Sequence, residues 1–170
     1  MVHLYAGNGK GKTTAAVGLA VRMAGSGGKV LFGQFLKSGK SSEVKALRQI
    51  SNIELFLPKQ FFGFTFRMDA KTKIQAAEYY REYFCEIKEK ISSYYQMVIL
   101  DEAIDVCNAE MIPEKEVINF LMEYGPGLEI VLTGRNPSEA VGNIADYYTE
   151  MKKIKHPYDR GIRARNGIEK

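Results

Sequence analysis

The sequence predicts a three-layer α/β fold, in which a mostly parallel central sheet of five or six strands carries helices on both faces. Apolar runs of four to eight residues alternate along the chain with segments of helical periodicity, which is typical of strand–helix–strand units. A glycine-rich turn separates the first apolar run from the first helical pattern. The 170 residues contain no internal repeat or low-complexity linker, so we expect one domain over residues 1–170.

The first elements are expected in a strand–helix–strand order. Val2–Ala6 is the first apolar run and should form a strand. A helix is predicted over residues 12–24, which are rich in Ala, Val and Leu, and Gly25 should help to end it. A second strand is predicted over residues 29–36 and a shorter third strand over residues 53–57.

A long helix is predicted over residues 70–95, because apolar side chains recur there at steps of three and four. The positions expected to face the core are Ile74, Ala77, Tyr80, Phe84, Ile87, Ile91 and Tyr94. The remaining elements are expected to be a strand over 97–100, a helix over Glu114–Tyr124, a strand over 129–133, a short helix over 138–145 and a possible sixth strand over 148–154.

Composition narrows the class of protein. The chain is 45% hydrophobic and 26% charged, as ordinary globular proteins are, and no apolar run approaches the roughly 18 residues of a membrane span. No signal peptide precedes the first strand, so we expect a cytoplasmic protein without a membrane partner. The two cysteines, Cys85 and Cys107, are too far apart for a Cys-x-x-Cys site.

The formal net charge of +4 is mild, and the basic excess lies near the C-terminus. Residues 152–170 hold seven Lys and Arg against Asp159 and Glu169. Such a run is usually a solvated tail. A nucleic-acid-binding module would predict strongly salt-dependent binding, but the chain carries no known nucleic-acid motif, so we expect no nucleic-acid partner.

The strongest chemical signal is the glycine-rich turn, which reads Gly7-Asn8-Gly9-Lys10-Gly11-Lys12-Thr13-Thr14. Glycines let backbone N–H groups approach phosphate oxygens, and the helix that follows directs its positive end at the same anion. Lys12 can supply a charge to the phosphates, and the Thr13 hydroxyl can bind Mg²⁺. The general motif G-x-x-x-x-G-K-[ST] would have glycine where Ala6 stands, yet the context favours a nucleotide site in a P-loop NTPase-like fold.

Three other strands end in residues suited to the same site. Asp101 and Glu102 follow a buried strand, and we expect them to bind the metal, although a helix-capping Asp is the alternative. Arg135 follows another strand and is either a phosphate or ribose contact or an exposed turn residue. Lys37 follows the second strand and is available to an anion.

A dense aromatic run over residues 61–66 falls in a predicted loop. Aromatic side chains on a loop either pack beneath it or present a surface to a flat apolar ligand. From the residues alone we expect packing.

Together these motifs resemble the P-loop ATP:corrinoid adenosyltransferases, which act on cob(I)alamin or cob(I)yrinic acid a,c-diamide. The resemblance spans nearly the whole chain, and the unusual glycine spacing is part of it. Beyond the glycine-rich turn it rests on Gln34-Phe35-Leu36-Lys37, Gly63-Phe64-Thr65, Ile99-Leu100-Asp101-Glu102, Thr133-Gly134-Arg135, the segment from Lys155 to Arg165 and Gly167-Ile168-Glu169.

The resemblance implies that a Co(I) corrinoid attacks the 5′ carbon of ATP, so that the 5′-deoxyadenosyl group is transferred and triphosphate leaves, in adenosylcobalamin synthesis or salvage. It implies Mg²⁺ or Mn²⁺ as cofactor, with Thr13, Asp101 and Glu102 on the metal side and Lys12, Glu102 and Arg135 as catalytic residues. Phe64 and Phe66 fall where the family has aromatics beside the corrinoid, and well-known members carry tryptophan in place of Phe66. The implied partners are an electron-donating reductase or flavodoxin-like protein and a second copy of the chain.

A different class of function fits the same glycine-rich turn. A generic P-loop ATPase or small-molecule kinase would direct Lys12, Thr13 and Asp101 at the γ-phosphate and release ADP.

Overall fold

Within the residues that the structure describes, six strands pair in parallel into one sheet with the order β3-β2-β4-β5-β1-β6. The protein is represented by a computed structural model that describes residues 1–63 and 65–169, without the side chain of Phe66. The strands are β1 Val2–Ala6, β2 Val30–Gln34, β3 Ile53–Phe56, β4 Met97–Asp101, β5 Glu129–Gly134 and β6 Tyr147–Glu150.

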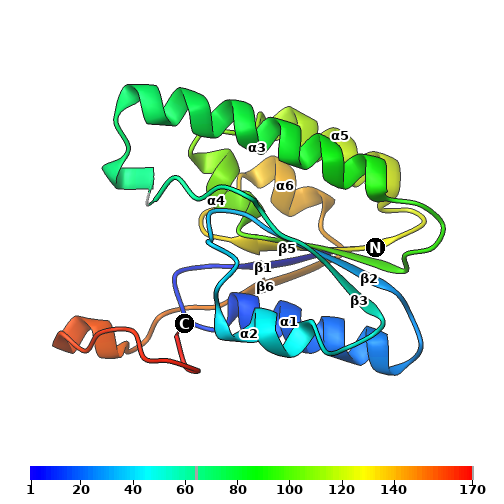
Figure 1. Cartoon of the computed structure of the whole chain (residues 1–170), viewed down its shortest axis with the longest axis horizontal. Coiled ribbons are helices and arrows are strands. Elements are labelled where there is room, and N and C mark those ends of the chain that lie inside the picture. The colour runs from blue at the N-terminus through cyan, green and yellow to red at the C-terminus, as the bar shows by residue number, and fades with distance from the viewer. Residues whose placement is uncertain (64, 170) are drawn as a thin grey trace.

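Helices cover both faces of the sheet, as the sequence predicts (Figure 1). On one face lie α1 (Lys12–Gly25) and α2 (Ser42–Leu47), and the other face carries α3 (Ala70–Lys90), α4 (Ala103–Asn108), α5 (Glu114–Tyr124) and α6 (Glu139–Ile144). Two 3₁₀ turns, η1 (Thr65–Arg67) and η2 (Pro157–Arg160), lie beyond the strand ends. The short helices α2 and α4, of 6 residues each, were not predicted.

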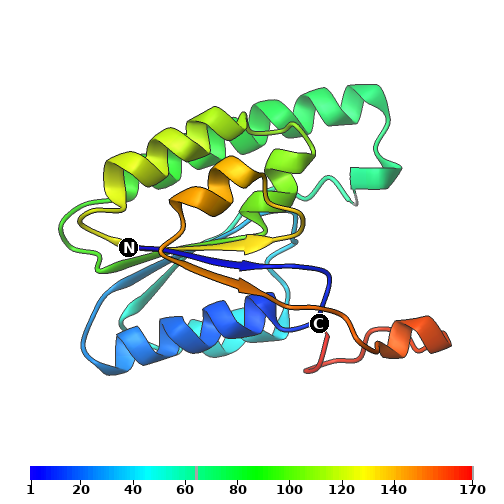
Figure 2. The same cartoon turned by 180° about the vertical axis from the view of Figure 1, so that it is seen from behind.

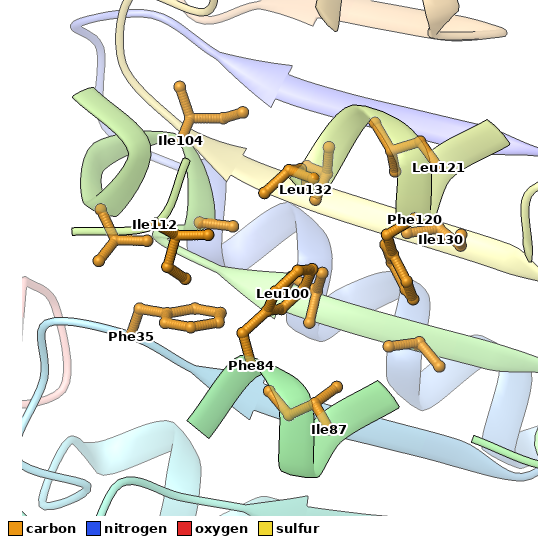
Figure 3. Packing of buried hydrophobic residues seen from close by; sticks show 14 of the residues in the cluster. Phe35, Phe84, Ile87, Leu100, Ile104, Ile112, Phe120, Leu121, Ile130 and Leu132 are labelled. Carbon is orange, nitrogen blue, oxygen red and sulfur yellow. The ribbon is translucent and has the colours of Figure 1, made fainter. Parts of the chain in front are cut away.

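The core consists of two layers separated by the sheet. Alternate side chains of a strand point to opposite faces, so Val98 and Leu100 join the cluster under α3 and α5, while Met97 and Ile99 join the smaller cluster under α1. Figure 3 shows the larger cluster, in which Phe84 of α3 and Phe120 of α5 pack edge to face with ring centroids 5.4 Å apart. Burial on both faces explains the continuous apolar runs.

The predicted core face of α3 was partly wrong. Tyr80, Phe84 and Ile87 are buried, whereas Ile74 is 62% exposed and Tyr94 is 55% exposed. The first turns of α3 extend beyond the carboxyl edge of the sheet, so Ile74 has no layer to pack on (Figure 1). The helix ends at Lys90 because Ile91 is already extended, which leaves Tyr94 in a separate turn.

Other boundaries differ by a few residues. The second strand is confined to Val30–Gln34, and the third ends at Phe56. The sixth strand is Tyr147–Glu150, so the predicted range of 148–154 extended too far. After Glu150 the chain leaves the sheet, and the backbones of Met151 and Lys153 contact the glycine-rich turn. None of the helices in the described part of the chain combines the length and apolar character needed to cross a membrane.

Candidate functional site

The carboxyl ends of the parallel strands bring the predicted site residues to one edge of the sheet. Gln34 at the end of β2 pairs in register with Asp101 at the end of β4, and Ala6 at the end of β1 pairs with Gly134 at the end of β5. The turn that follows Ala6 lies at this edge, and the loop before α3 and the C-terminal segment project beyond it (Figures 1 and 2).

The glycine-rich turn is shaped by a backbone neighbour that the sequence did not indicate. The Met151 N–H donates to the Ala6 carbonyl at 2.7 Å, and the Gly9 N–H donates to the Met151 carbonyl at 2.6 Å. A Cβ on either Gly7 or Gly9 would lie 2.6 Å from that carbonyl oxygen. Gly7 and Gly11 also have φ of 106° and 120°, which strongly favours glycine. The turn therefore needs glycine for both contact and conformation.

The outer rim of the turn is exposed and meets the C-terminal segment. Asn8, Lys10 and Thr14 are all exposed. The Asn8 side-chain oxygen accepts a hydrogen bond of 2.9 Å from the Lys153 backbone N–H. The basic segment thus begins against the turn, while most of residues 152–168 remain exposed.

Helix α1 begins at the turn with features of an anion site. Its N-cap residue, Gly11, provides no side-chain cap, and no acidic residue occupies the first turn. The first N–H groups and the positive end of the helix dipole are consequently available to an anion. Lys12 Nζ donates to the Gly9 carbonyl at 2.9 Å, so the ammonium folds back over the turn. Burial and then the charge of Arg135 lower the pKa of Lys12.

Asp101 is the centre of the hydrogen-bond network and is completely buried. Its Oδ1 accepts from the hydroxyls of Thr13 at 2.8 Å and Thr133 at 2.7 Å. Its Oδ2 accepts from Lys37 Nζ at 2.7 Å and Gln34 Nε2 at 3.1 Å. Four donors compensate the burial of the carboxylate, as a buried charge requires. The predicted proximity of Thr13 to Asp101 is therefore present.

Lys37 lies deeper in the site than its sequence position suggested. Its Nζ donates to Thr13 Oγ1 at 3.1 Å as well as to Asp101. Glu43 Oε1 and Glu102 Oε1 each lie 3.7 Å from the same Nζ. Burial alone would lower the pKa of Lys37, but Asp101 and Glu102 outweigh it and raise that pKa. The ammonium is the positive charge around which these oxygens gather.

Glu102 has an unusual backbone conformation, with a φ of 63°. Its N–H donates to Thr133 Oγ1 at 2.9 Å, which holds the residue in place. Burial and the neighbouring charge of Asp101 raise the pKa of Glu102 to about 7, against the opposing effect of Lys37. A left-handed non-glycine residue at a strand end is a feature of functional sites.

Arg135 is exposed at the same edge, and its backbone is fixed from two sides. The Asn108 side chain donates to the Arg135 carbonyl at 2.7 Å, and the Asp105 carboxylate accepts from the Arg135 backbone. Burial raises the pKa of Asp105, while Arg135 and Lys12 oppose that rise. Arg135, Lys12 and Asp105 thus form one charged group beside the turn.

The aromatic run is only partly described. The ring of Phe62 lies 5.5 Å from that of Tyr79 on α3, so this residue packs beneath the loop as expected. Phe64 lies outside the described residues, and the side chain of Phe66 does too. Their proposed contact with a corrinoid therefore stays a prediction.

Several residues of the site had no predicted role. These are Gln34, Glu43, Asp105, Thr133 and Met151. Gln34 and Thr133 could have been found, because each is a polar residue at the carboxyl end of an otherwise apolar strand. The contact of Met151 with the turn is made by its backbone, and its position in the sequence carries no signal of it.

A family profile and several relatives with similar sequences carry the same description. The profile of the family described as "ATP:corrinoid adenosyltransferase BtuR/CobO/CobP" matches residues 1–169. The corrinoid adenosyltransferase of Escherichia coli K12 is 31% identical over 170 residues, which cover 99% of this chain and 85% of that protein. A Sinorhizobium protein with the same name is 34% identical over 176 residues, which cover 99% of this chain and 79% of that protein.

Solved structures support the fold. The KaiC-like protein PH0186 of Pyrococcus horikoshii aligns with a TM-score of 0.51 and 15% identity, over 91% of this chain and 73% of that one. EssC (ATPases 2 and 3) of Geobacillus thermodenitrificans aligns with a TM-score of 0.53 and 18% identity, over 99% of this chain and 36% of that one. The predicted P-loop NTPase-like fold is confirmed.

Proposed function

The chain belongs to the ATP:corrinoid adenosyltransferase family and adenosylates corrinoids with ATP, and from that premise we propose how its residues divide the reaction. The glycine-rich turn holds the triphosphate of ATP as a leaving group. The Co(I) of the corrinoid attacks the 5′ carbon, a cobalt–carbon bond forms, the bond from C5′ to oxygen breaks, and its electron pair leaves with the triphosphate. The family match disfavours the alternative of a generic P-loop ATPase or small-molecule kinase.

The observation that carries this proposal is the uncapped start of α1 beside Lys12, facing the buried Asp101 network. Charge grows on the triphosphate as the bond to C5′ breaks, so groups that stabilise negative charge accelerate the step. The Lys12 ammonium and the backbone N–H groups at the start of α1 can provide that stabilisation, whereas the Gly9 N–H is already bonded to the Met151 carbonyl. Arg135 lies beside Lys12 and is proposed to add a second positive charge at the same edge.

A divalent cation, Mg²⁺ or Mn²⁺, is proposed to bind through Thr13, Asp101 and Glu102. These residues offer hydroxyl and carboxylate oxygens, which hard cations prefer, and the Lys37 ammonium 2.7 Å from Asp101 indicates that the site accommodates positive charge. Among the described residues, no cluster of three or more His, Cys, Asp and Glu forms a complete metal site. When bound, the cation would neutralise part of the charge on the triphosphate.

The corrinoid is proposed to lie beyond the carboxyl edge of the sheet, where the loop before α3 projects (Figure 1). Phe64 and Phe66 are proposed to contact it there and to exclude water from the cobalt, since an apolar ring cannot coordinate the metal. Delivery of the electron by a reductase or flavodoxin-like protein, a homodimeric assembly and a cytoplasmic location complete the proposal.

Substitution of Lys12 tests the proposed phosphate contact. Lys12→Ala should abolish both alkylcobalt formation and triphosphate release with ATP, Mg²⁺ and chemically reduced corrinoid, because the leaving group loses the ammonium proposed to stabilise it. Lys45→Ala, at an exposed position of α2, is the matched control and should retain turnover. Far-UV circular dichroism would verify the fold of both variants, and normal turnover by a folded Lys12→Ala protein would remove Lys12 from the mechanism.

A further inference from the structure

The Lys37 ammonium lies among oxygen atoms of the kinds that also bind hard cations. Its Nζ lies 2.7 Å from Asp101 Oδ2, 3.1 Å from Thr13 Oγ1 and 3.7 Å from Glu102 Oε1. A fourth oxygen, Glu43 Oε1, also lies at 3.7 Å. The ammonium is therefore surrounded by one hydroxyl and three carboxylate oxygens from three separate segments of the chain. Three of these residues are the ones proposed above to bind the divalent cation.

We infer that the Lys37 ammonium is an internal counter-ion that fills the cation site of the free protein, so that a divalent cation binds well only after Lys37 has been drawn away by ATP. The inference rests on the proposed metal site and assigns to Lys37 a role in the order of binding.

The Lys37 ammonium and a divalent cation would compete directly for the hydroxyl oxygen of Thr13. Its hydroxyl hydrogen is donated to Asp101 Oδ1, and its oxygen accepts from Lys37. A metal ion needs an oxygen lone pair directed at the site, which the ammonium N–H now engages. Two cations held around the same oxygens also repel each other strongly in a partly buried environment. Lys37 and the cation therefore exclude one another.

The Lys37 side chain is positioned so that its ammonium can move away from Asp101. Its side chain is 23% exposed, whereas that of Asp101 is 0% exposed, so the ammonium has a route to solvent that the carboxylate lacks. The residue before it, Leu36, has a φ of 52°, and Gly39 after it has a φ of 66°. Phe35 is fully buried and its N–H donates to the Asp101 carbonyl at 2.8 Å, whereas Leu36 and Lys37 are only partly buried. The segment from Leu36 onward is thus a turn at the edge of the site.

The triphosphate of ATP provides the alternative partner. Its negative charge, held by the start of α1, would attract the Lys37 ammonium away from Asp101 and free the oxygens for the cation. Binding of ATP and of the cation would then reinforce each other, and by linkage the coupling works equally in both directions. Without ATP, the same site should discriminate against free divalent cations.

The experiment measures Mn²⁺ binding without nucleotide, by electron paramagnetic resonance of the unbound ion. Lys37→Gln removes the charge but keeps a hydrogen-bond donor for Asp101. Lys37→Met removes both the charge and the donor. Both should bind Mn²⁺ at least tenfold more tightly than the wild type, and Lys37→Arg should not. Lys40→Met, a nearby exposed lysine, is the matched control and should bind as the wild type does. Equal or weaker binding by Lys37→Gln would overturn the inference.

Lys37→Gln decides the matter even if Lys37→Met fails to fold, because it is the uncharged variant that keeps a hydrogen-bond donor to Asp101. The gain should disappear in Lys37→Gln combined with Thr13→Val, which removes the proposed hydroxyl ligand; a gain that survives would place the ion elsewhere and overturn the inference. A separate titration with ATP tests the underlying site. If Thr13→Val leaves Mn²⁺ binding in the ATP complex unchanged, the proposed metal site fails. If Thr13→Val weakens Mn²⁺ binding in the ATP complex but Lys37→Gln does not tighten Mn²⁺ binding without ATP, the metal site stands and only the role of Lys37 fails.

Discussion

Replacement of Thr133 by valine removes one hydroxyl from the centre of the site and leaves the shape of the side chain nearly unchanged. The Thr133 side chain is buried, with 1% of the residue exposed. Its hydroxyl donates to Asp101 Oδ1 at 2.7 Å and accepts from the Glu102 N–H at 2.9 Å. The substitution therefore withdraws one donor from a buried carboxylate and leaves the N–H of a strained residue without its acceptor.

The two losses set the expected magnitude. A hydrogen bond to a charged group contributes about 1.5–3 kcal/mol, and a neutral one contributes about 0.5–1.5 kcal/mol. Thr133→Val should therefore lower the free energy of unfolding by about 2–4.5 kcal/mol. A domain with a stability of about 5–15 kcal/mol would still fold at 25 °C.

Urea unfolding followed by circular dichroism measures this change, with Thr133→Ser as the control that restores the hydroxyl. The wild-type slope of free energy against urea should be retained, and Thr133→Ser should recover most of the loss. If Thr133→Val loses less than about 0.5 kcal/mol, or if Thr133→Ser is equally destabilised, the hydroxyl does not support Asp101 and Glu102 in the way described.

Two further predictions concern Glu102 and the glycine-rich turn. The pKa of Glu102 is raised from 4.5 to about 7 in the folded protein. The stability contributed by its protonated form is therefore present below the unfolded pKa and is lost as pH rises through about 7. Urea unfolding in metal-free buffer should show that the wild type loses stability relative to Glu102→Gln as the pH rises from 4.5 to about 7. If the unfolding free energies of the two proteins change in parallel with pH, the prediction is contradicted. Gly9→Ala places a Cβ 2.6 Å from the Met151 carbonyl oxygen, and its affinity for ATP, measured by calorimetry, should be at least tenfold weaker. The control is Gly18→Ala, whose Cβ would have no neighbour within 4 Å. It should bind ATP normally and be more stable by about 0.5–1 kcal/mol. Equal ATP affinity in the two variants would show that the packing of Met151 is irrelevant to the turn.

The sheet and its main helices could be predicted because their signals are local. Apolar runs buried on both faces identify β2, β4 and β5, and the position of Thr13 after a glycine-rich turn identifies the start of α1. The end of α3 could not be predicted in this way, since Ile91 and Tyr94 continue the apolar spacing after the backbone has become extended. Exposure of Ile74 depends on where the sheet ends, which is a property of the assembled layers.

The hydrogen-bond network of the site could be predicted only for residues that belong to a recognised sequence motif. Thr13 and Asp101 were expected to lie together, but the motif does not say that Lys37 binds both. Lys37 was expected to be available to an anion at the end of the second strand. Its place among four oxygens follows from the turn after β2 and from Glu43 on an unpredicted helix. The contact between Met151 and Gly9 joins residues more than 140 positions apart through backbone atoms alone.

Analysis of the phosphorus products tests the central claim most directly. The protein would be incubated with ATP, Mg²⁺ and chemically reduced corrinoid, while ³¹P nuclear magnetic resonance follows the phosphates and the visible spectrum follows alkylcobalt. Attack at the 5′ carbon predicts one intact triphosphate for every alkylcobalt formed, and both should be absent when the corrinoid is left oxidised. Formation of ADP in step with turnover would mean that a phosphorus atom is attacked, and would contradict the account.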